Sequence, residues 1–217
     1  MSAWTLEDGT VISEGDIIDS DITLYADFKA PSAFFGANDF TSATVGDANT
    51  LSIEKVEAQG DEPAFYRVTS KISGSVKDSQ SKSYFKLKSD GFDYDLGRSP
   101  YMAVGIRSDA AYANNYSEMN IEIGGTTLWG LPSLKKGTEI TKTVIDLTTQ
   151  AKGGNGSAIV NGDGAKNYET YIKGNKLDKL MVRISWGQGA VLSEGQTVDV
   201  VYVAFFDTKS AAESFTF

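Results

Sequence analysis

The sequence predicts an all-β protein, a jelly-roll-like β-sandwich of roughly ten to twelve strands with one short helix near the C-terminus. Short runs rich in β-branched and aromatic residues recur along the whole chain, and many alternate apolar with polar positions. Glycine is frequent, at 22 residues, and proline is scarce, at 4, as expected for strands joined by tight turns. Hydrophobic residues make up 41% of the 217, enough for one core, so we expect a single domain over residues 1–217.

The first third of the chain is expected to hold a hairpin and then several short strands. Residues Trp4–Ile12 are divided by Asp8-Gly9, a dipeptide typical of hairpin turns. Residues Ile22–Phe28 alternate in hydrophobicity and should form a strand with one apolar face. After a long loop over residues 30–49, strands are expected at Leu51–Val56, Phe65–Val68 and Lys71–Val76.

The middle of the chain carries the strongest strand and turn signals. Tyr84–Lys88 alternates with its lysines outward, and Tyr101–Arg107 is apolar on both faces, which indicates a central strand. Gly124-Gly125 lies between two β-prone runs and is the strongest hairpin signal. Long loops are expected over residues 90–100 and 152–171. The remaining strands are expected at Met119–Ile123, Thr126–Leu131, Glu139–Leu147 and Leu177–Trp186.

The last strand candidate, Thr197–Phe206, is a continuous β-prone run in which Asp199 is the one charged residue. Both of its faces are therefore expected to be covered, as in a strand at the centre of a sheet. Residues 207–213 should begin a short helix, with Asp207 or Thr208 as the N-cap. A central strand this late means that the core closes at the end of the chain.

Charge disfavours two classes of partner. The chain has 20 basic and 29 acidic residues, a net charge of −9, and its one adjacent basic pair is Lys135-Lys136. A nucleic-acid backbone would be repelled, and so would an anionic membrane surface. No run approaches the ~18–20 apolar residues of a membrane span. A neutral polysaccharide carries no such penalty.

The chain has no histidine and no cysteine. The missing histidine removes Ser-His-Asp and Cys-His nucleophilic sites as well as His-ligated zinc. Carboxylate, Lys, Tyr or Ser/Lys chemistry remains open, but no carboxylate pair is distinguished by its spacing. We therefore expect a non-catalytic protein, with a polysaccharide lyase or glycosidase as the enzyme alternative.

An acidic segment suggests one possible cofactor. Asp90, Asp93 and Asp95 place three carboxylates within six residues of an expected loop. Calcium takes six to eight oxygen ligands, and such loops suit it, although the spacing is not that of an EF-hand. The sequence thus predicts a possible structural calcium site, with an ordinary solvated Asp-rich turn as the alternative.

Aromatic residues near strand ends are the first candidates for sugar binding, because sugar rings stack their C–H faces on aromatic planes. Trp129 precedes a glycine and a proline, and Trp186 is followed by Gly187, which would let a ligand come close. Trp186 also shares an expected face with Leu180 and other apolar residues, so a core role is equally open. Two tyrosines flank a pair of asparagines in an expected loop, Tyr112 and Tyr116.

Three charged residues complete the candidate ligand-binding set. Arg107 and Arg183 lie in otherwise apolar strands, where a charge needs either a carboxylate partner or a ligand-facing surface. Glu122 lies between two isoleucines in an expected strand, so it either faces a ligand or is a solvent-facing position of the alternation.

Three parts of the last half of the chain carry a family resemblance: Tyr101–Arg107, Leu180–Trp186, and Val200–Asp207 followed by Ala211–Phe215. These segments resemble the strands of β-sandwich modules in secreted proteins of gut Firmicutes. The resemblance implies a carbohydrate-binding module, similar to those of ruminococcal starch-adherence (amylosome) proteins, with α-glucan as the favoured ligand and an extracellular or cell-surface location. Because only three residues precede Trp4, we expect the leader peptide to be missing from this sequence. A structural or adhesion domain of a cell-surface assembly is the other alternative.

Overall fold

The structure is a computed structural model, and it describes thirteen stretches of the chain. Sixteen strands and two helices are assigned in them, so the all-β class and the two-layer sandwich are confirmed. The strand number exceeds the ten to twelve expected because three short strands were not predicted: Ala33–Gly36 (β4), Ser42–Val45 (β5) and Val191–Leu192 (β15). The described stretches are residues 3–6, 10–13, 15–17, 21–23, 25–27, 30–75, 84–95, 98–108, 116–123, 126–131, 137–150, 176–186 and 191–217.

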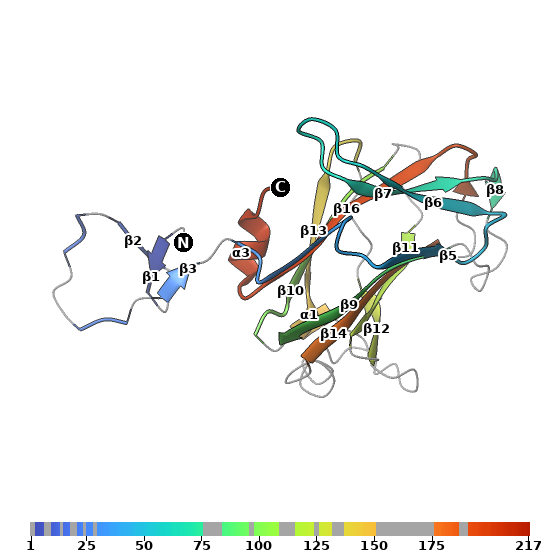
Figure 1. The fold of residues 1–217 in the computed structure, drawn as a ribbon. Coiled ribbons are helices and arrows are strands. Elements are labelled where there is room, and N and C mark those ends of the chain that lie inside the picture. The colour runs from blue at the N-terminus through green and yellow to red at the C-terminus, as the bar shows by residue number, and fades with distance from the viewer. Residues whose placement is uncertain are drawn as a thin grey trace.

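The first layer is a six-stranded antiparallel sheet in the order β13-β10-β16-β7-β6, with β4 also paired to β16 (Figure 1). Strand β16 pairs with β10 along one edge and with β7 and then β4 along the other. Strands β10 and β16, which the sequence predicted to be central, therefore each lie between two neighbouring strands. The bounds of the six strands are Ala33–Gly36 (β4), Leu51–Val56 (β6), Phe65–Ser70 (β7), Tyr101–Ser108 (β10), Thr141–Asp146 (β13) and Thr197–Phe206 (β16).

The second layer is a five-stranded antiparallel sheet in the order β12-β11-β14-β9-β5. The predicted glycine hairpin is confirmed, since Ile123 pairs with Thr126 and two residues separate them. The bounds of its strands are Ser42–Val45 (β5), Tyr84–Asp95 (β9), Tyr116–Ile123 (β11), Thr126–Leu131 (β12) and Lys176–Trp186 (β14).

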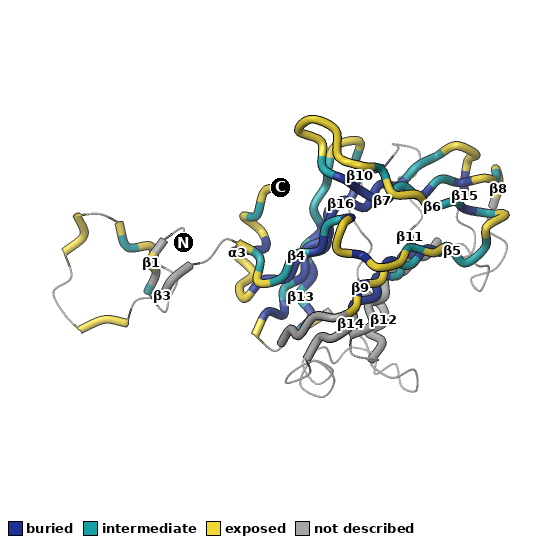
Figure 2. The backbone as a smooth tube through the Cα atoms, viewed as in Figure 1, coloured by how far each residue is buried: buried dark blue, intermediate teal, exposed yellow. Residues whose placement is uncertain are grey.

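The main core lies between the two sheets. Alternate residues of each strand point inward, so Val104, Val182 and Phe85 are fully buried together with Val198 and Phe205. Figure 2 shows β16 and β10 buried along their lengths. Both faces of β16 are covered, as predicted, because a second cluster packs on the outer face of the same sheet.

A β-bulge in β16 divides the outer face of the six-stranded sheet. Gly105 pairs with Tyr202 and Ile106 with Val200, so Val201 is the extra residue. The alternation of inward and outward side chains along β16 therefore shifts by one residue at this point. Val201 and Tyr202, although consecutive, both belong to the outer cluster. The Tyr202 ring lies over Gly105, where an added Cβ would be 2.1 Å from the ring.

The C-terminal helix α3, Lys209–Ser214, covers the outer face beyond the bulge. Its N-cap is Thr208, one of the two predicted, whose hydroxyl accepts a hydrogen bond from the Ala211 amide. Ala211 and Ala212 are buried against Ala204 and Phe206. The short helix α1, Leu147–Gln150, follows β13.

Two small sheets complete the fold. The predicted N-terminal hairpin forms, with Trp4 opposite Ile12, and a third strand joins it to give the order β2-β1-β3. Figure 1 shows this sheet beside the sandwich, on the side of α3. In the described part of the chain, no helix is long and apolar enough to cross a membrane. The remaining bounds are Ala3–Thr5 (β1), Val11–Ile12 (β2), Tyr25–Asp27 (β3), Gly74–Ser75 (β8) and Val191–Leu192 (β15).

Some local predictions were wrong. Residues 30–49, expected as a loop, contain β4 and β5, and residues 90–95 continue β9 rather than opening a loop. Tertiary pairing decides these segments, because β4 gains hydrogen bonds from β16 and β9 gains them from β14. Of the strand expected over residues 71–76, the described residues 71–75 form only the two residues of β8, Gly74–Ser75. The expected loop over residues 152–171 lies outside the described residues.

Candidate functional site

The structure distributes the sequence-predicted site residues over both sheets. Arg107 lies in β10 of the six-stranded sheet, and Tyr112 lies outside the described residues. The other five belong to adjacent strands of the five-stranded sheet: Tyr116 and Glu122 in β11, Trp129 in β12, and Arg183 and Trp186 in β14. Two candidate sites follow, one on each sheet.

The face of the five-stranded sheet turned away from the core carries a cationic and aromatic group. Val182 and Ile184 of β14 are buried in the core, so Arg183 between them is on the opposite face. Its guanidinium carbon lies 4.2 Å from the centroid of the Tyr84 ring in β9. The Lys86 ammonium lies 5.4 Å from the same centroid. We call these three residues the Tyr84 group.

The strand register relates the predicted residues of β11 and β14 to the Tyr84 group. Arg183 pairs with Lys86 on one side and with Asn120 on the other. Tyr116 is the cross-strand partner of Trp186, one position beyond the pair formed by Ser185 and Tyr84. The two roles considered for Trp186, core and ligand contact, both stay predictions.

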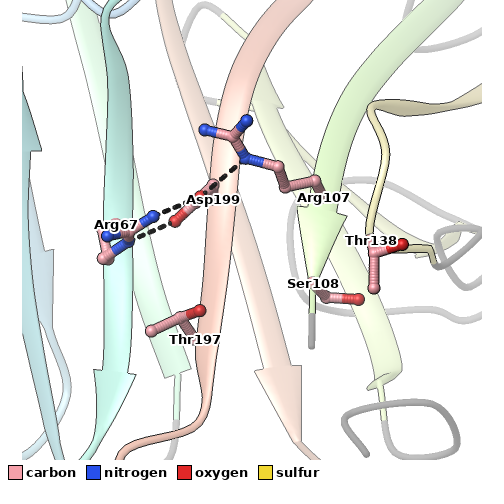
Figure 3. Close-up of a pocket in the computed structure, with 6 residues that line it drawn as sticks. All are labelled: Arg67, Arg107, Ser108, Thr138, Thr197 and Asp199. Carbon is pink, nitrogen blue, oxygen red and sulfur yellow. Dashed lines mark hydrogen bonds and ion pairs between the residues drawn. The ribbon is translucent and has the colours of Figure 1, made fainter. Parts of the chain in front are cut away.

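The second candidate site is built around the buried Asp199 of β16. Asp199 is 2% exposed, and two arginines from the neighbouring strands bind its carboxylate. Arg67 of β7 donates to both oxygens, each at 2.8 Å, and Arg107 of β10 donates to Oδ2 at 2.9 Å (Figure 3). Bidentate, charge-assisted bonds of this kind are the strongest that side chains make. Arg107 therefore has a carboxylate partner, which is one of the two interpretations that the sequence left open.

A buried phenylalanine and a second carboxylate fix the two arginines further. The guanidinium carbons of Arg107 and Arg67 lie 4.7 and 5.1 Å from the ring centroid of Phe65. Arg107 also forms an ion pair with Glu62, at 3.1 Å. Burial lowers the pKa of Arg107, but the hydrogen bonds and charges of Asp199 and Glu62 outweigh it and raise that pKa above its ordinary value.

A pocket of about 150 Å³ opens beside Asp199. Figure 3 shows Arg67 and Arg107 on either side of β16, with Thr197 on that strand and Thr138 on the β10 side. Ser108 also lines the pocket, is 3% exposed, and its hydroxyl has no hydrogen-bond partner among the described residues. The lining is wholly polar: Arg67, Arg107, Ser108, Thr138, Thr197 and Asp199. We call this the Asp199 pocket.

The premise of the calcium prediction was wrong, because Asp90, Asp93 and Asp95 lie in strand β9 and not in a loop. Asp90 is exposed, and its carboxylate accepts a hydrogen bond of 3.3 Å from the Thr41 hydroxyl. Within the described ranges, no group of three or more Asp and Glu residues is arranged to hold a metal ion. Calcium binding stays a prediction.

Sequence reasoning missed Arg67, Tyr84 and the grouping around Asp199. One signal was present, since Asp199 is the one charge in a ten-residue apolar strand and a buried charge requires partners. Its partners could not be named, because Arg67 and Arg107 lie 132 and 92 residues away along the chain.

No protein-family model matches the sequence, and no curated protein matches it. Solved structures that resemble the fold include the family 11 carbohydrate-binding module of the cellulosomal cellulase Lic26A-Cel5E of Clostridium thermocellum. That match has a TM-score of 0.46 at 14% identity and covers 82% of this chain and 96% of that one. The xylan-binding module CBM86 of Roseburia intestinalis is similar at a TM-score of 0.35 and 14% identity, covering 82% and 97%.

A third similar structure is a family 43 glycoside hydrolase, an arabinoxylan arabinofuranohydrolase from Bacillus subtilis. Its TM-score is 0.37 at 10% identity, and the match covers 93% of this chain but 32% of that chain. Because all three TM-scores are below one half, the fold assignment rests on the strand pairing described above.

Proposed function

We propose that this chain is a non-catalytic polysaccharide-binding module that binds a neutral glycan on the exposed face of the five-stranded sheet. The observation that supports it most is the Tyr84 group, in which an aromatic ring holds the Arg183 guanidinium at 4.2 Å. A guanidinium carries five N–H donors, and contact with an aromatic ring uses none of them. Hydroxyl groups of a sugar chain lying along the sheet would accept hydrogen bonds from them.

In this proposal, side chains from neighbouring strands each make a different kind of contact with the glycan. Arg183 and Glu122 would hydrogen-bond hydroxyls, as donor and acceptor respectively. Stacking would come from Trp129 in β12 of the same sheet and from Tyr112 just before β11. Trp186 and its cross-strand partner Tyr116 stand at register positions of the opposite face from Arg183, so this proposal does not assign them to the surface. Adjacent strands lie about 4.8 Å apart, so residues on three strands can contact consecutive sugar residues.

The charge of the chain supports a neutral ligand. At −9, it repels sulfated or uronic-acid-rich polymers, whereas a neutral glycan meets no such barrier. The sequence resemblance implies an α-glucan. The ligand panel also includes a mixed-linkage β-glucan and xylan, because the similar modules are a family 11 module in complex with a β-1,3-1,4-mixed-linked tetrasaccharide and a xylan-binding one. We further propose that the module belongs to a secreted or cell-surface protein.

Affinity electrophoresis tests this proposal directly. The protein is run in native gels containing amylopectin, mixed-linkage β-glucan, xyloglucan, xylan, mannan or no polymer. We expect retardation in at least one gel. Arg183→Ala should weaken it about tenfold or more, because a hydrogen bond to a charged group is worth about 1.5–3 kcal/mol.

The matched control is Arg98→Ala, which removes the same charge from an exposed arginine between β9 and β10. It should migrate like the parent protein in every polymer gel. Circular dichroism confirms that each variant is folded. Unchanged mobility in all gels would overturn the proposed function. If Arg183→Ala and the parent protein were retarded equally, the binding site would not include the Tyr84 group.

A further inference from the structure

We propose that the Asp199 pocket is a second ligand site, which takes a single neutral polyhydroxylated ring such as one sugar residue. It lies on the other sheet from the Tyr84 group and does not depend on the function proposed there. The ring could come from a free monosaccharide or from the end of a polymer chain, and the experiment below separates these two sources.

The chemistry of the lining suits such a ligand. The residues that line the pocket include three with hydroxyl groups, Ser108, Thr138 and Thr197, together with two arginines as donors and Asp199 as acceptor. A sugar hydroxyl both donates and accepts, so it needs both kinds of group at once. No apolar side chain lines the pocket, which disfavours a hydrophobic ligand.

The charged groups of the pocket are held in place before any ligand arrives. Arg67, Asp199 and Arg107 come from three adjacent strands, and three hydrogen bonds of 2.8–2.9 Å join them. The ring of Phe65 supports both guanidiniums. Preorganised polar groups lose little entropy on binding, so they favour a ligand more than mobile surface side chains do.

The local charge points to a neutral ligand and not an anion. Asp199 and Glu62 balance the charges of Arg67 and Arg107, so the pocket offers no excess positive charge. A phosphate or carboxylate would have to compete with these two carboxylates for the same guanidiniums. It would also approach a chain whose net charge is −9.

Ser108 adds a second observation. Its hydroxyl is buried without a partner among the described residues, which costs free energy unless another group bonds it. Ser108 is also one of the residues that line the pocket.

Size limits the ligand to one ring. The pocket volume of about 150 Å³ is half or less of the roughly 300–1,000 Å³ of sites that enclose drug-sized ligands. A longer oligosaccharide would leave its other residues in solvent. The pocket is therefore suited to a chain end or a free sugar and not to an internal stretch of polymer.

Nuclear magnetic resonance tests the proposal, because it detects weak binding at individual groups. Glucose, xylose, mannose or galactose is added to the 15N-labelled protein, and the side-chain Nε–H signals of Arg67 and Arg107 are followed. We expect at least one sugar to shift both signals in a saturable way. Ser108→Ala and Thr138→Val should each weaken that binding about three- to tenfold, as expected for one lost neutral hydrogen bond.

Stability provides a readout that separates this role from a structural one. Ser108→Ala removes an unpartnered buried hydroxyl, so it should leave the melting temperature unchanged or raised. The matched control is Ser89→Ala, since Ser89 is also 3% exposed but its hydroxyl donates to the Asp39 carbonyl at 2.6 Å. That variant should melt lower and bind sugar normally.

Three comparisons distinguish the outcomes. Trisaccharides binding more tightly than their monosaccharides would indicate a chain end, and equal affinity would indicate a free sugar; both support the site. Arg183→Ala should leave the sugar-induced shifts of Arg67 and Arg107 unchanged. A negative result for the Tyr84 group would therefore not count against the Asp199 pocket. No saturable shift with any sugar, or tighter binding of glucuronate than of glucose, would overturn the proposal.

Discussion

The outer face of the six-stranded sheet contains two regions that differ although they share strands β16 and β10. Beyond the bulge at Val201, Tyr202 is sealed under the C-terminal segment, with ring centroids 5.5 and 5.0 Å from Phe215 and Phe217. Before the bulge, Asp199 is covered by two arginines and a pocket remains open. One region buries apolar rings and is closed, whereas the other buries a charge and stays accessible.

The difference shows how a single extra residue can partition a sheet face. The bulge shifts the alternation by one position, and β16 pairs with β7 before Val201 and with β4 after it. The aromatic residues beyond it are close enough to α3 to be covered. The polar residues before the bulge bind one another and line the open pocket. The first region therefore stabilises the fold, and the second is the region for which we propose a binding role.

The largest expected effect comes from breaking the charge cluster. Asp199→Ala should lower the free energy of unfolding by on the order of 3 kcal/mol, because it leaves two arginines facing each other without their shared carboxylate. Urea denaturation measures this. The control is Glu213→Ala, which breaks the exposed Lys209–Glu213 pair at 3.6 Å and should change stability by less than about 0.5 kcal/mol. Equal effects of the two variants would show that burial of Asp199 is not what matters.

An intermediate effect should appear in the sealed region at high pH. Burial raises the pKa of Tyr202 from 10.0 to about 12. Between these values the unfolded chain has lost the proton and the folded protein has kept it, so stability falls as pH rises. The loss attributable to Tyr202 should approach on the order of 2 kcal/mol by pH 12.

Tyr202→Phe is the comparison for this titration. Its urea-unfolding free energy should decline less between pH 10 and pH 12 than that of the parent, because the buried ionisable group is gone. Absorbance of tyrosinate should show a late-titrating residue in the parent that Tyr202→Phe lacks. Parallel pH profiles for the two proteins would contradict the proposed burial of Tyr202.

The smallest expected effect is at the cap of the covering helix. The Thr208 hydroxyl accepts a hydrogen bond of 3.1 Å from the Ala211 amide, so Thr208→Ala should lower stability by about 1 kcal/mol. Thr208→Ser keeps the hydroxyl and should recover most of it. Thermal unfolding measures both variants, and sugar-induced shifts at Arg67 and Arg107 should be unaffected. A loss of those shifts in Thr208→Ala would show that the two regions are coupled.

Much of the fold could be predicted because strand signals are local. Thr197–Phe206 was expected as a central strand from its composition alone, and Gly124-Gly125 was expected as a hairpin turn. Strands β4 and β5 were not, because Ala33–Gly36 and Ser42–Val45 are short and flanked by turn residues. Their strand character comes from pairing with β16 and β9, which no local window contains.

Less of the candidate sites could be predicted. The sequence singled out Arg107 and Arg183 because a charge in an apolar strand requires a partner. It could not pair Arg107 with Asp199, or place Tyr84 against Arg183, because those contacts join strands far apart in the chain. Asp90 shows the opposite error. The calcium prediction assumed that its segment is a loop, and the structure shows that the segment is part of strand β9.

The sequence by itself determined the class of the fold, its central strands and its capped C-terminal helix. Each of these depends on alternation, turn residues or a single capping hydroxyl within a short window. Only the tertiary structure decided which strands are neighbours, where Val201 interrupts the alternation, and that Asp199, Arg67 and Arg107 meet beside a pocket. The physical reason is that strand pairing is set by hydrogen bonds and core packing between distant segments, which local preference does not specify.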